Sequence, residues 1–135
     1  MAGLMYLLDT NIFLEYILRR PRVREVRDFF QRIDPFAISI SDFSLHTLGV
    51  IYTREHKPDK FLVFVNEDIL ASGIRILSIE PEHFSGITGA AARFDLDFDD
   101  AYQYAVAEQY NLTIISYDRD FDRTPKGRKE PKDIR

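Results

Sequence analysis

Short apolar runs rich in β-branched and aromatic residues alternate along this chain with longer segments whose apolar residues recur at helical spacing. The runs cover residues 4–8, 36–40, 74–79 and 112–116. The first is apolar at every position, which is typical of a central strand buried on both faces of a sheet. Strands that alternate with helices pair in parallel, because parallel neighbours need long crossover connections. We therefore predict a three-layer α/β sandwich with a mostly parallel sheet flanked by helices.

The segments between the strands predict helices with Pro or Gly near their ends. The last two predicted helices, at 82–93 and 98–111, are joined by a short linker. If the second begins at the edge where the parallel strands end, the first must tilt away from the sheet. Beyond Phe121 the chain is polar, and we expect a loosely ordered tail with room for one short edge strand. The remaining predicted helices cover residues 12–18, 23–33, 41–51 and 61–70.

The size and composition of the chain fit one globular domain over residues 1–135, with a polar C-terminal tail from about residue 122. A chain of this length buries roughly two-thirds of its unfolded surface, so a bound metal would serve chemistry rather than folding. The absence of cysteine excludes disulfides, thiolate nucleophiles and cysteine-based zinc sites. No apolar stretch approaches the roughly 20 residues that span a bilayer. We expect a cytoplasmic protein without membrane attachment.

The charge distribution restricts nucleic-acid binding to local surfaces. A net charge of −4 and a pI near 5.3 give a field that does not attract a polyanion. Basic residues nevertheless cluster at 19–27 and again at 119–135. Each cluster fits either a solvated helix end or a phosphate-binding surface, so neither alone decides the function.

Acidic residues follow the ends of the predicted strands. Asp9 comes directly after the first strand, and Asp118 lies just past Ser116 at the end of the last one. Asp42 and Asp100 lie in the first turns of helices expected to start at the same edge, where parallel sheets bind ligands. A lone Asp at a helix start simply stabilises the helix. Several carboxylates at one edge repel one another unless a cation bridges them, which favours Mg²⁺ or Mn²⁺.

Three segments carry a family resemblance: LLDTN at 7–11, DDA at 99–101 and ISYDRDF at 115–121. Together they resemble the signature segments of PIN-domain proteins, the family that includes the VapC-type toxin ribonucleases of toxin–antitoxin pairs. The resemblance implies a five-stranded parallel sheet and Mg²⁺- or Mn²⁺-dependent hydrolysis of RNA. It also implies an antitoxin partner and a homodimer. The implied metal ligands are Asp9, Asp100 and Asp118, with Asn11 and Ser116 as polar residues that support them.

One position departs from this family pattern. The family usually has a Glu one turn into the helix after the second strand, and the corresponding residue here is His46. A His is a poor ligand for Mg²⁺ but acceptable to Mn²⁺, and it can act as an acid or base near neutral pH. Asp42, one turn earlier on the same helix face, can supply the missing negative charge. His46 is therefore either a catalytic residue or a half-buried histidine hydrogen-bonded to a carboxylate.

The predicted activity is that of a divalent-metal-dependent endoribonuclease, the toxin of a toxin–antitoxin pair. The ion activates water and the scissile phosphate. Additional acids, Asp97, Asp99 and Asp120, either hold a second ion through water or tune the first one. An acidic pocket needs a basic rim to bind RNA. The predicted rim residues are Arg19, Arg20, Arg22, Arg119 and Arg123.

Two other functions remain open. Because His46 replaces the usual Glu, the domain is alternatively an RNA- or protein-binding module with weakened or lost catalysis. A phosphatase of the haloacid-dehalogenase type also places an Asp after its first strand, but it needs a second acid two residues later and a lysine before its last acids. Asn11 occupies that second place, and no lysine lies between Lys60 and Lys126.

Overall fold

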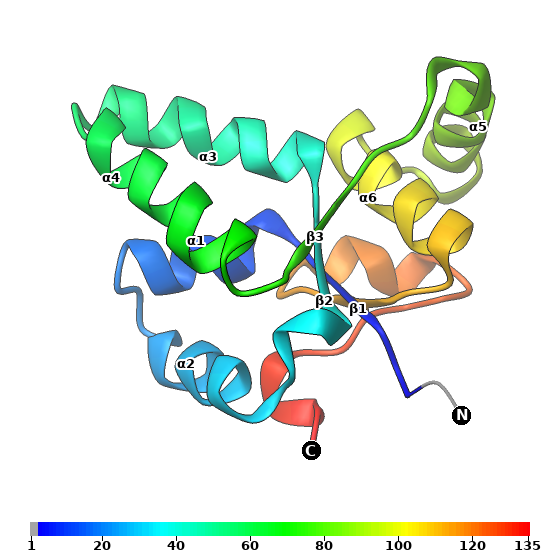
Figure 1. Ribbon diagram of the computed structural model, residues 1–135. Helices are drawn as coiled ribbons and strands as arrows, with labels where there is room; N and C mark the ends of the chain where they lie inside the picture. The colour runs from blue at the N-terminus through cyan, green and yellow to red at the C-terminus, as the bar shows by residue number, and fades with distance from the viewer. Residues whose placement is uncertain (1–2) are drawn as a thin grey trace.

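The computed structural model describes residues 3–135 and contains one parallel sheet (Figure 1). The strands are β1 (Tyr6–Leu8), β2 (Ile38–Ser41), β3 (Arg75–Leu77) and β4 (Thr113–Ile115), in the order β3-β2-β1-β4. All three strand pairings are parallel. The all-apolar first strand lies inside the sheet, as its sequence predicts.

Helices cover both faces of this sheet (Figure 1). The three-layer α/β sandwich is therefore confirmed. Short 3₁₀ turns connect several elements, and one more lies near the C-terminus: η1 (Pro35–Ala37), η3 (Pro81–His83), η4 (Arg119–Arg123) and η5 (Pro131–Asp133). One face carries α1 (Thr10–Ile17), α2 (Val23–Arg32), α3 (Asp42–Arg54), α4 (Pro58–Val63) and its π-helical continuation η2 (Phe64–Leu70), and the other carries α5 (Phe84–Phe94) and α6 (Phe98–Tyr110).

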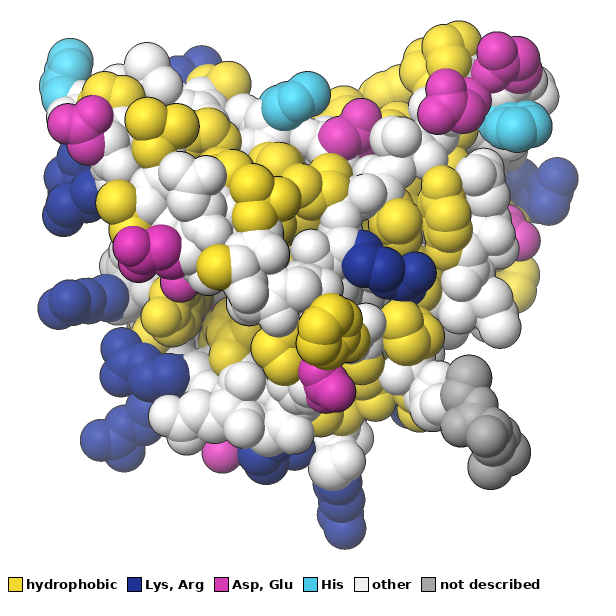
Figure 2. All heavy atoms as spheres, in the orientation of Figure 1, with side chains coloured by type: hydrophobic (Ala, Val, Ile, Leu, Met, Phe, Trp, Pro, Cys, Tyr) yellow, Lys and Arg dark blue, Asp and Glu magenta, His cyan; other side chains and the backbone are white. Residues whose placement is uncertain are grey.

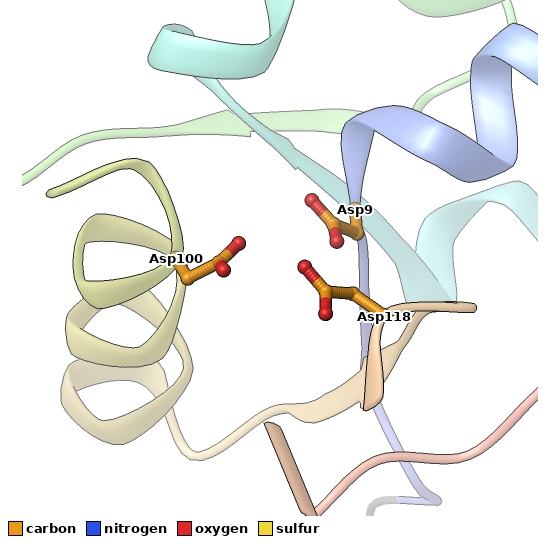
Figure 3. A group of neighbouring side chains, drawn as sticks. All are labelled: Asp9, Asp100 and Asp118. Atoms are coloured by element: carbon orange, nitrogen blue, oxygen red, sulfur yellow. The ribbon is translucent and has the colours of Figure 1, made fainter. Parts of the chain in front are cut away.

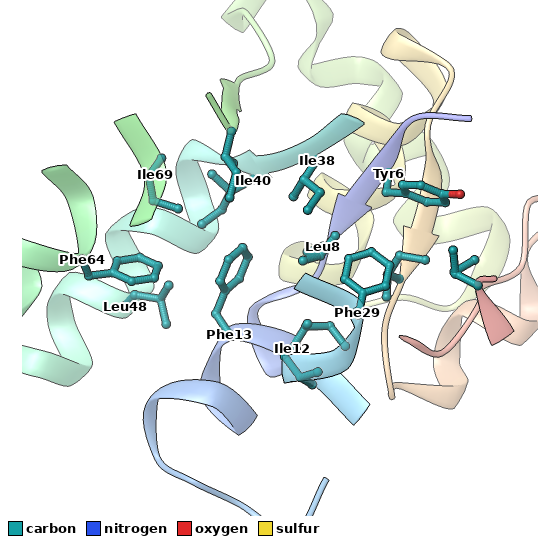
Figure 4. Close-up of a cluster of buried hydrophobic side chains, with 14 residues drawn as sticks. Tyr6, Leu8, Ile12, Phe13, Phe29, Ile38, Ile40, Leu48, Phe64 and Ile69 are labelled. Atoms are coloured by element: carbon teal, nitrogen blue, oxygen red, sulfur yellow. The ribbon is translucent and has the colours of Figure 1, made fainter. Parts of the chain in front are cut away.

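The sheet divides the apolar core into two parts. Tyr6 and Leu8 pack on one side with Phe13 and Phe29 of α1 and α2 (Figure 4). Leu7 points to the other side, into the cluster built on α5 and α6. Successive side chains of a strand point to opposite faces, so the all-apolar β1 places apolar side chains in both clusters. The strand β1 is thus held from both faces at the point where Asp9 follows it.

The sheet has four strands rather than the five that the family resemblance implies. The place beside β4 is taken by a C-terminal segment that pairs at a single residue, Lys129, with Ile115. Pro125 and Pro131 flank this segment, and a proline cannot donate a backbone hydrogen bond to a ladder. The pairing therefore stops before it becomes a strand.

The expectation of a loosely ordered tail is wrong. The backbone N–H of Lys129 donates to the carbonyl of Ile114 at 2.8 Å, and the backbone N–H of Ser116 donates to the carbonyl of Lys129 at 3.0 Å. The Arg128 guanidinium donates to the carbonyl of Ser116 at 3.1 Å, and the Ile134 side chain is buried in the core. A segment that is polar by composition is thus anchored by its few buried contacts.

The link between α5 and α6 decides where Asp100 lies. Asp95 ends α5 in the left-handed conformation, with φ of 53°, and the Asp97 side chain caps the N-terminus of α6. The α5 helix packs mainly against α6 rather than against the strands (Figure 1). The α6 helix is therefore free to begin at the edge where the strands end. This is the arrangement predicted for the helix that carries Asp100.

Among residues 3–135, no helix is both long enough and apolar enough to cross a bilayer.

Candidate metal centre

Three carboxylates from distant parts of the chain meet at the carboxyl edge of the sheet (Figure 3). Asp9 follows β1, Asp118 follows β4, and Asp100 lies in the first turn of α6. One carboxylate oxygen from each lies within 4.8 Å of the others. Among residues 3–135 this is the one group of three or more acidic, His or Cys side chains with that spacing. Parallel topology explains the meeting, because it places the ends of all strands on one edge.

The Asp9 carboxylate accepts four hydrogen bonds, two on each oxygen. Its Oδ1 accepts from the backbone N–H of Thr10 at 2.8 Å and from Nε2 of Gln103 at 3.0 Å. Its Oδ2 accepts from Oγ of Ser116 at 2.7 Å and from Nδ2 of Asn11 at 3.3 Å. The side chain is 7% exposed. These donors fix its orientation and compensate for burial of its charge.

Short hydrogen bonds also hold the other two acids. The Asp97 carboxylate accepts from the backbone N–H of Asp100 at 3.0 Å, so Asp97 acts on the site through the helix start. The Ser116 hydroxyl accepts from the backbone N–H of Asp118 at 2.9 Å. The Asp118 carboxylate accepts from the backbone N–H of Asp120 at 2.8 Å. Ser116 therefore contacts the turns that carry both Asp9 and Asp118.

The electrostatics of the group favour a cation. Burial raises the pKa of Asp9, although the hydrogen bonds from Ser116, Gln103 and Thr10 oppose this rise. Burial, with the nearby charges of Asp118 and Asp9, raises the pKa of Asp100 to about 8. Mg²⁺ prefers oxygen ligands at 2.0–2.1 Å, which places two such oxygens no more than about 4.2 Å apart. The three carboxylate oxygens therefore need to move only slightly closer to one another to bind such an ion. This set of residues fits a hard divalent ion.

In EDTA near pH 9, we expect Asp100→Asn to raise the free energy of unfolding by on the order of 2 kcal/mol. The folded chain holds the Asp100 proton more tightly than the unfolded chain does. Wild-type stability therefore falls as the pH rises from the ordinary pKa of 3.8 to about 8, and Asn removes this loss. Urea unfolding across this range measures the effect. Equal pH dependence of the two proteins would contradict it.

Gln103 and Ser44 also belong to the site, although the sequence patterns did not predict them. Gln103 lies one turn after Asp100 on α6, and its Nε2 also donates to Oγ of Ser44 at 2.7 Å. The Ser44 hydroxyl is in turn 2.7 Å from Oγ1 of Thr10. The spacing of three residues from Asp100 is the signal that could have found Gln103, because such residues share a helix face.

His46 does not join the carboxylates. Ser44 is the α3 residue that faces the site, and two residues further on, the helix has turned by roughly 200°. His46 is accordingly exposed, and the half-buried Thr47 takes the place one turn beyond Ser44. The half-buried structural role expected for His46 disagrees with this exposure, and catalysis by His46 stays a prediction.

Asp42 also lies outside the cluster. Its carboxylate accepts from the Tyr102 hydroxyl at 2.7 Å and from the backbone N–H of Phe43 at 2.8 Å. Tyr102 follows Asp100 by two residues on α6 and so projects from a different side of that helix. Asp42 is therefore not one of the three clustered carboxylates, and its contribution of negative charge to the site stays a prediction. Asp99 is exposed in the first turn of α6.

The predicted basic rim is only partly available. The Arg22 guanidinium lies 4.2 Å from the ring centre of Tyr117, the residue before Asp118, and it is exposed. Arg123 instead donates to the carbonyl of Phe94 at 3.0 Å and pairs with Asp120 at 3.0 Å. Arg123 thus links η4 to the end of α5, and its contact with RNA stays a prediction. Basic side chains gather along the edge formed by α2 and the turn before it (Figure 2), and Arg19, Arg20 and Arg119 are exposed.

A family model described as the PIN domain matches residues 6–127. The chain belongs to the PIN domain family. The match covers all four strands and the three clustered acids. No curated protein sequence matches this PIN domain.

Solved structures share the fold of this PIN domain at low sequence identity. A toxin–antitoxin complex from Klebsiella pneumoniae is 21% identical with a TM-score of 0.76, covering 93% of this chain and 97% of that one. DNA-bound VapBC from Salmonella typhimurium is 24% identical with a TM-score of 0.74, covering 95% and 98%. The sarcin–ricin loop cleaving toxin VapC20 from Mycobacterium tuberculosis is 15% identical with a TM-score of 0.72, covering 87% and 92%.

Proposed function

We propose that this PIN domain is a Mg²⁺- or Mn²⁺-dependent endoribonuclease and the toxin of a toxin–antitoxin pair. The observation that carries the proposal is the meeting of Asp9, Asp100 and Asp118 at the carboxyl edge of the sheet. The similarity to toxin structures, one of which is described as cleaving the sarcin–ricin loop, supports RNA as the substrate.

The residues around the cluster have distinct proposed roles. The three Asp carboxylates would hold the ion, which when bound polarises the scissile phosphate and lowers the pKa of an attacking water. Asn11 and Ser116 keep the Asp9 carboxylate oriented through their hydrogen bonds. The exposed arginines near Asp118 and in the turn before α2 would bind the RNA backbone. These residues are Arg19, Arg20, Arg22 and Arg119.

The proposal predicts that cleavage depends on a divalent ion. Purified protein is incubated with single-stranded and structured RNA in Mg²⁺, in Mn²⁺ and in EDTA. We expect cleavage in at least one metal, its loss in EDTA and its return when metal is added in excess. Cleavage that persists in EDTA at the same rate would refute the metal dependence.

We also propose an antitoxin partner, a homodimer and a cytoplasmic location. Structures that resemble this chain are complexes of toxin and antitoxin. Where a gene for a small protein adjoins the gene for this chain, adding that protein to the same cleavage assay tests inhibition by an antitoxin. Light scattering measures the oligomeric state.

A second candidate function is RNA binding without cleavage. The observation in its favour is that α3 contributes no carboxylate to the cluster, which has three acids. In the same experiment this candidate predicts RNA binding with no cleavage in either metal.

A further inference from the structure

Gln103 is a buried amide whose two hydrogens are both committed to the metal centre. It is 3% exposed, and its Nε2 donates to Oδ1 of Asp9 and to Oγ of Ser44. A primary amide nitrogen carries two hydrogens, so its donor capacity is used completely. The opposite orientation of the amide would set its oxygen against the Asp9 carboxylate, acceptor against acceptor.

The other end of this amide is left without a partner. Within residues 3–135, Oε1 of Gln103 is one of two buried side-chain atoms without a hydrogen bond. A buried acceptor without a donor costs about 1–3 kcal/mol. An apolar side chain of the same volume would avoid that cost but would leave the buried Asp9 carboxylate with one donor fewer, so the glutamine is explained by the acid that it contacts. The donor end of the side chain must serve a purpose that outweighs the loss.

The position of Gln103 connects the elements that carry the acids. It lies one turn after Asp100, so its hydrogen bond to Asp9 links α6 directly to the end of β1. Its second hydrogen bond extends the link to α3 through Ser44, whose hydroxyl contacts Thr10 at the start of α1. The separation of the Asp9 and Asp100 carboxylates is therefore set partly through this one amide.

We propose that Gln103 is a positioning residue that fixes the Asp9 carboxylate, relative to Asp100, for binding a divalent cation. This inference rests on the proposed function and extends it to a residue that would not touch the ion. A neutral amide suits the task, because it donates to the carboxylate without adding a fourth negative charge. Loss of such a partner behind a metal ligand typically weakens metal affinity or activity 10- to 100-fold.

The decisive variant is Gln103→Met, which keeps the side-chain volume and removes both donors. We expect the Kd for Mn²⁺, measured by electron paramagnetic resonance of the free ion, to rise by about 10-fold or more. The free energy of unfolding, measured with urea in EDTA, should change by less than about 1.5 kcal/mol, because the substitution conserves volume and removal of the unpaired oxygen offsets the donor lost to Asp9. RNA cleavage should recover toward the wild-type rate when Mn²⁺ is raised to saturation.

Gln109→Met is the matched control, since Gln109 is exposed on the same helix and away from the acids. It should leave both the Mn²⁺ affinity and the stability unchanged. A Gln103→Met protein that is less stable but binds Mn²⁺ as tightly as wild type would overturn the proposal, because that result is expected of a purely structural residue.

A measurement on the wild-type protein keeps the inference testable if Gln103→Met fails to fold. The side-chain amide pair of Gln103 is followed by ¹⁵N–¹H spectroscopy during titration with diamagnetic Mg²⁺. We expect both amide protons to shift with the same midpoint as ion binding and to exchange slowly with solvent. Protons that do not respond to Mg²⁺ binding would overturn the proposal.

The experiments separate this inference from the proposed function. If wild type binds Mn²⁺ and Gln103→Met weakens that binding, but neither protein cleaves RNA, the ribonuclease proposal fails and the role of Gln103 stands. If wild type cleaves RNA and Gln103→Met has unchanged Mn²⁺ affinity, the inference fails and the ribonuclease proposal stands.

Discussion

Asp9→Asn is expected to lower the rate of metal-dependent RNA cleavage by at least about 10²-fold, beyond the 10- to 100-fold typical of residues behind a metal ligand. Asn keeps the shape of Asp but offers one neutral oxygen where the carboxylate offers two charged ones. Its amide nitrogen would also face Nδ2 of Asn11, donor against donor. The site then loses one negative charge and the fixed orientation of its most buried ligand. Cleavage of a labelled RNA under single-turnover conditions measures the loss.

The matched control for this prediction is Asp95→Asn. Asp95 is exposed, lies outside the cluster, and has a positive φ that Asn tolerates as well as Asp does. We expect wild-type cleavage from this variant. A double variant, Asp9→Asn with Asp100→Asn, that cleaves RNA as fast as wild type would show that the cluster is not the active site.

The second large effect concerns the C-terminal segment. Deletion of residues 128–135 should lower the free energy of unfolding by about 4 kcal/mol. The deletion removes the buried side chain of Ile134 and the Arg128 hydrogen bonds to Ser116 and Asp122. It also removes both backbone hydrogen bonds between Lys129 and the end of β4. Urea unfolding followed by circular dichroism measures the change.

Removal of Arg135 alone is the control, because this terminal residue is exposed. It should change stability by less than about 0.5 kcal/mol. If the longer deletion were equally harmless, the segment would be a dispensable tail after all. A large loss would show that a stretch predicted to be loose from its polar composition is part of the fold.

Much of the fold followed from local patterns. The unbroken apolar run before Asp9 predicts a strand covered on both faces, and residues 6–8 form such a strand. The alternation of strands with helices predicts parallel pairing. Composition was a poor guide to the C-terminal segment, because it averages over a stretch in which the contacts of three residues, Arg128, Lys129 and Ile134, decide the order.

The surroundings of the acids were harder to predict. A helix turns by about 100° per residue, so a small error in its phase moves a side chain to another face. This is why His46 was placed at the site, whereas Ser44 faces it and His46 is exposed. Gln103 was not predicted, because its hydrogen bond to Asp9 depends on which face of α6 packs toward the end of β1.

The sequence by itself determined that Asp9, Asp100 and Asp118 would lie at one edge, because parallel topology gathers the ends of all strands and the starts of the helices that follow them. The tertiary structure decided which neighbouring side chains turn toward these acids. That choice depends on helix phase and on packing between elements distant in the chain, which no local pattern of residues encodes.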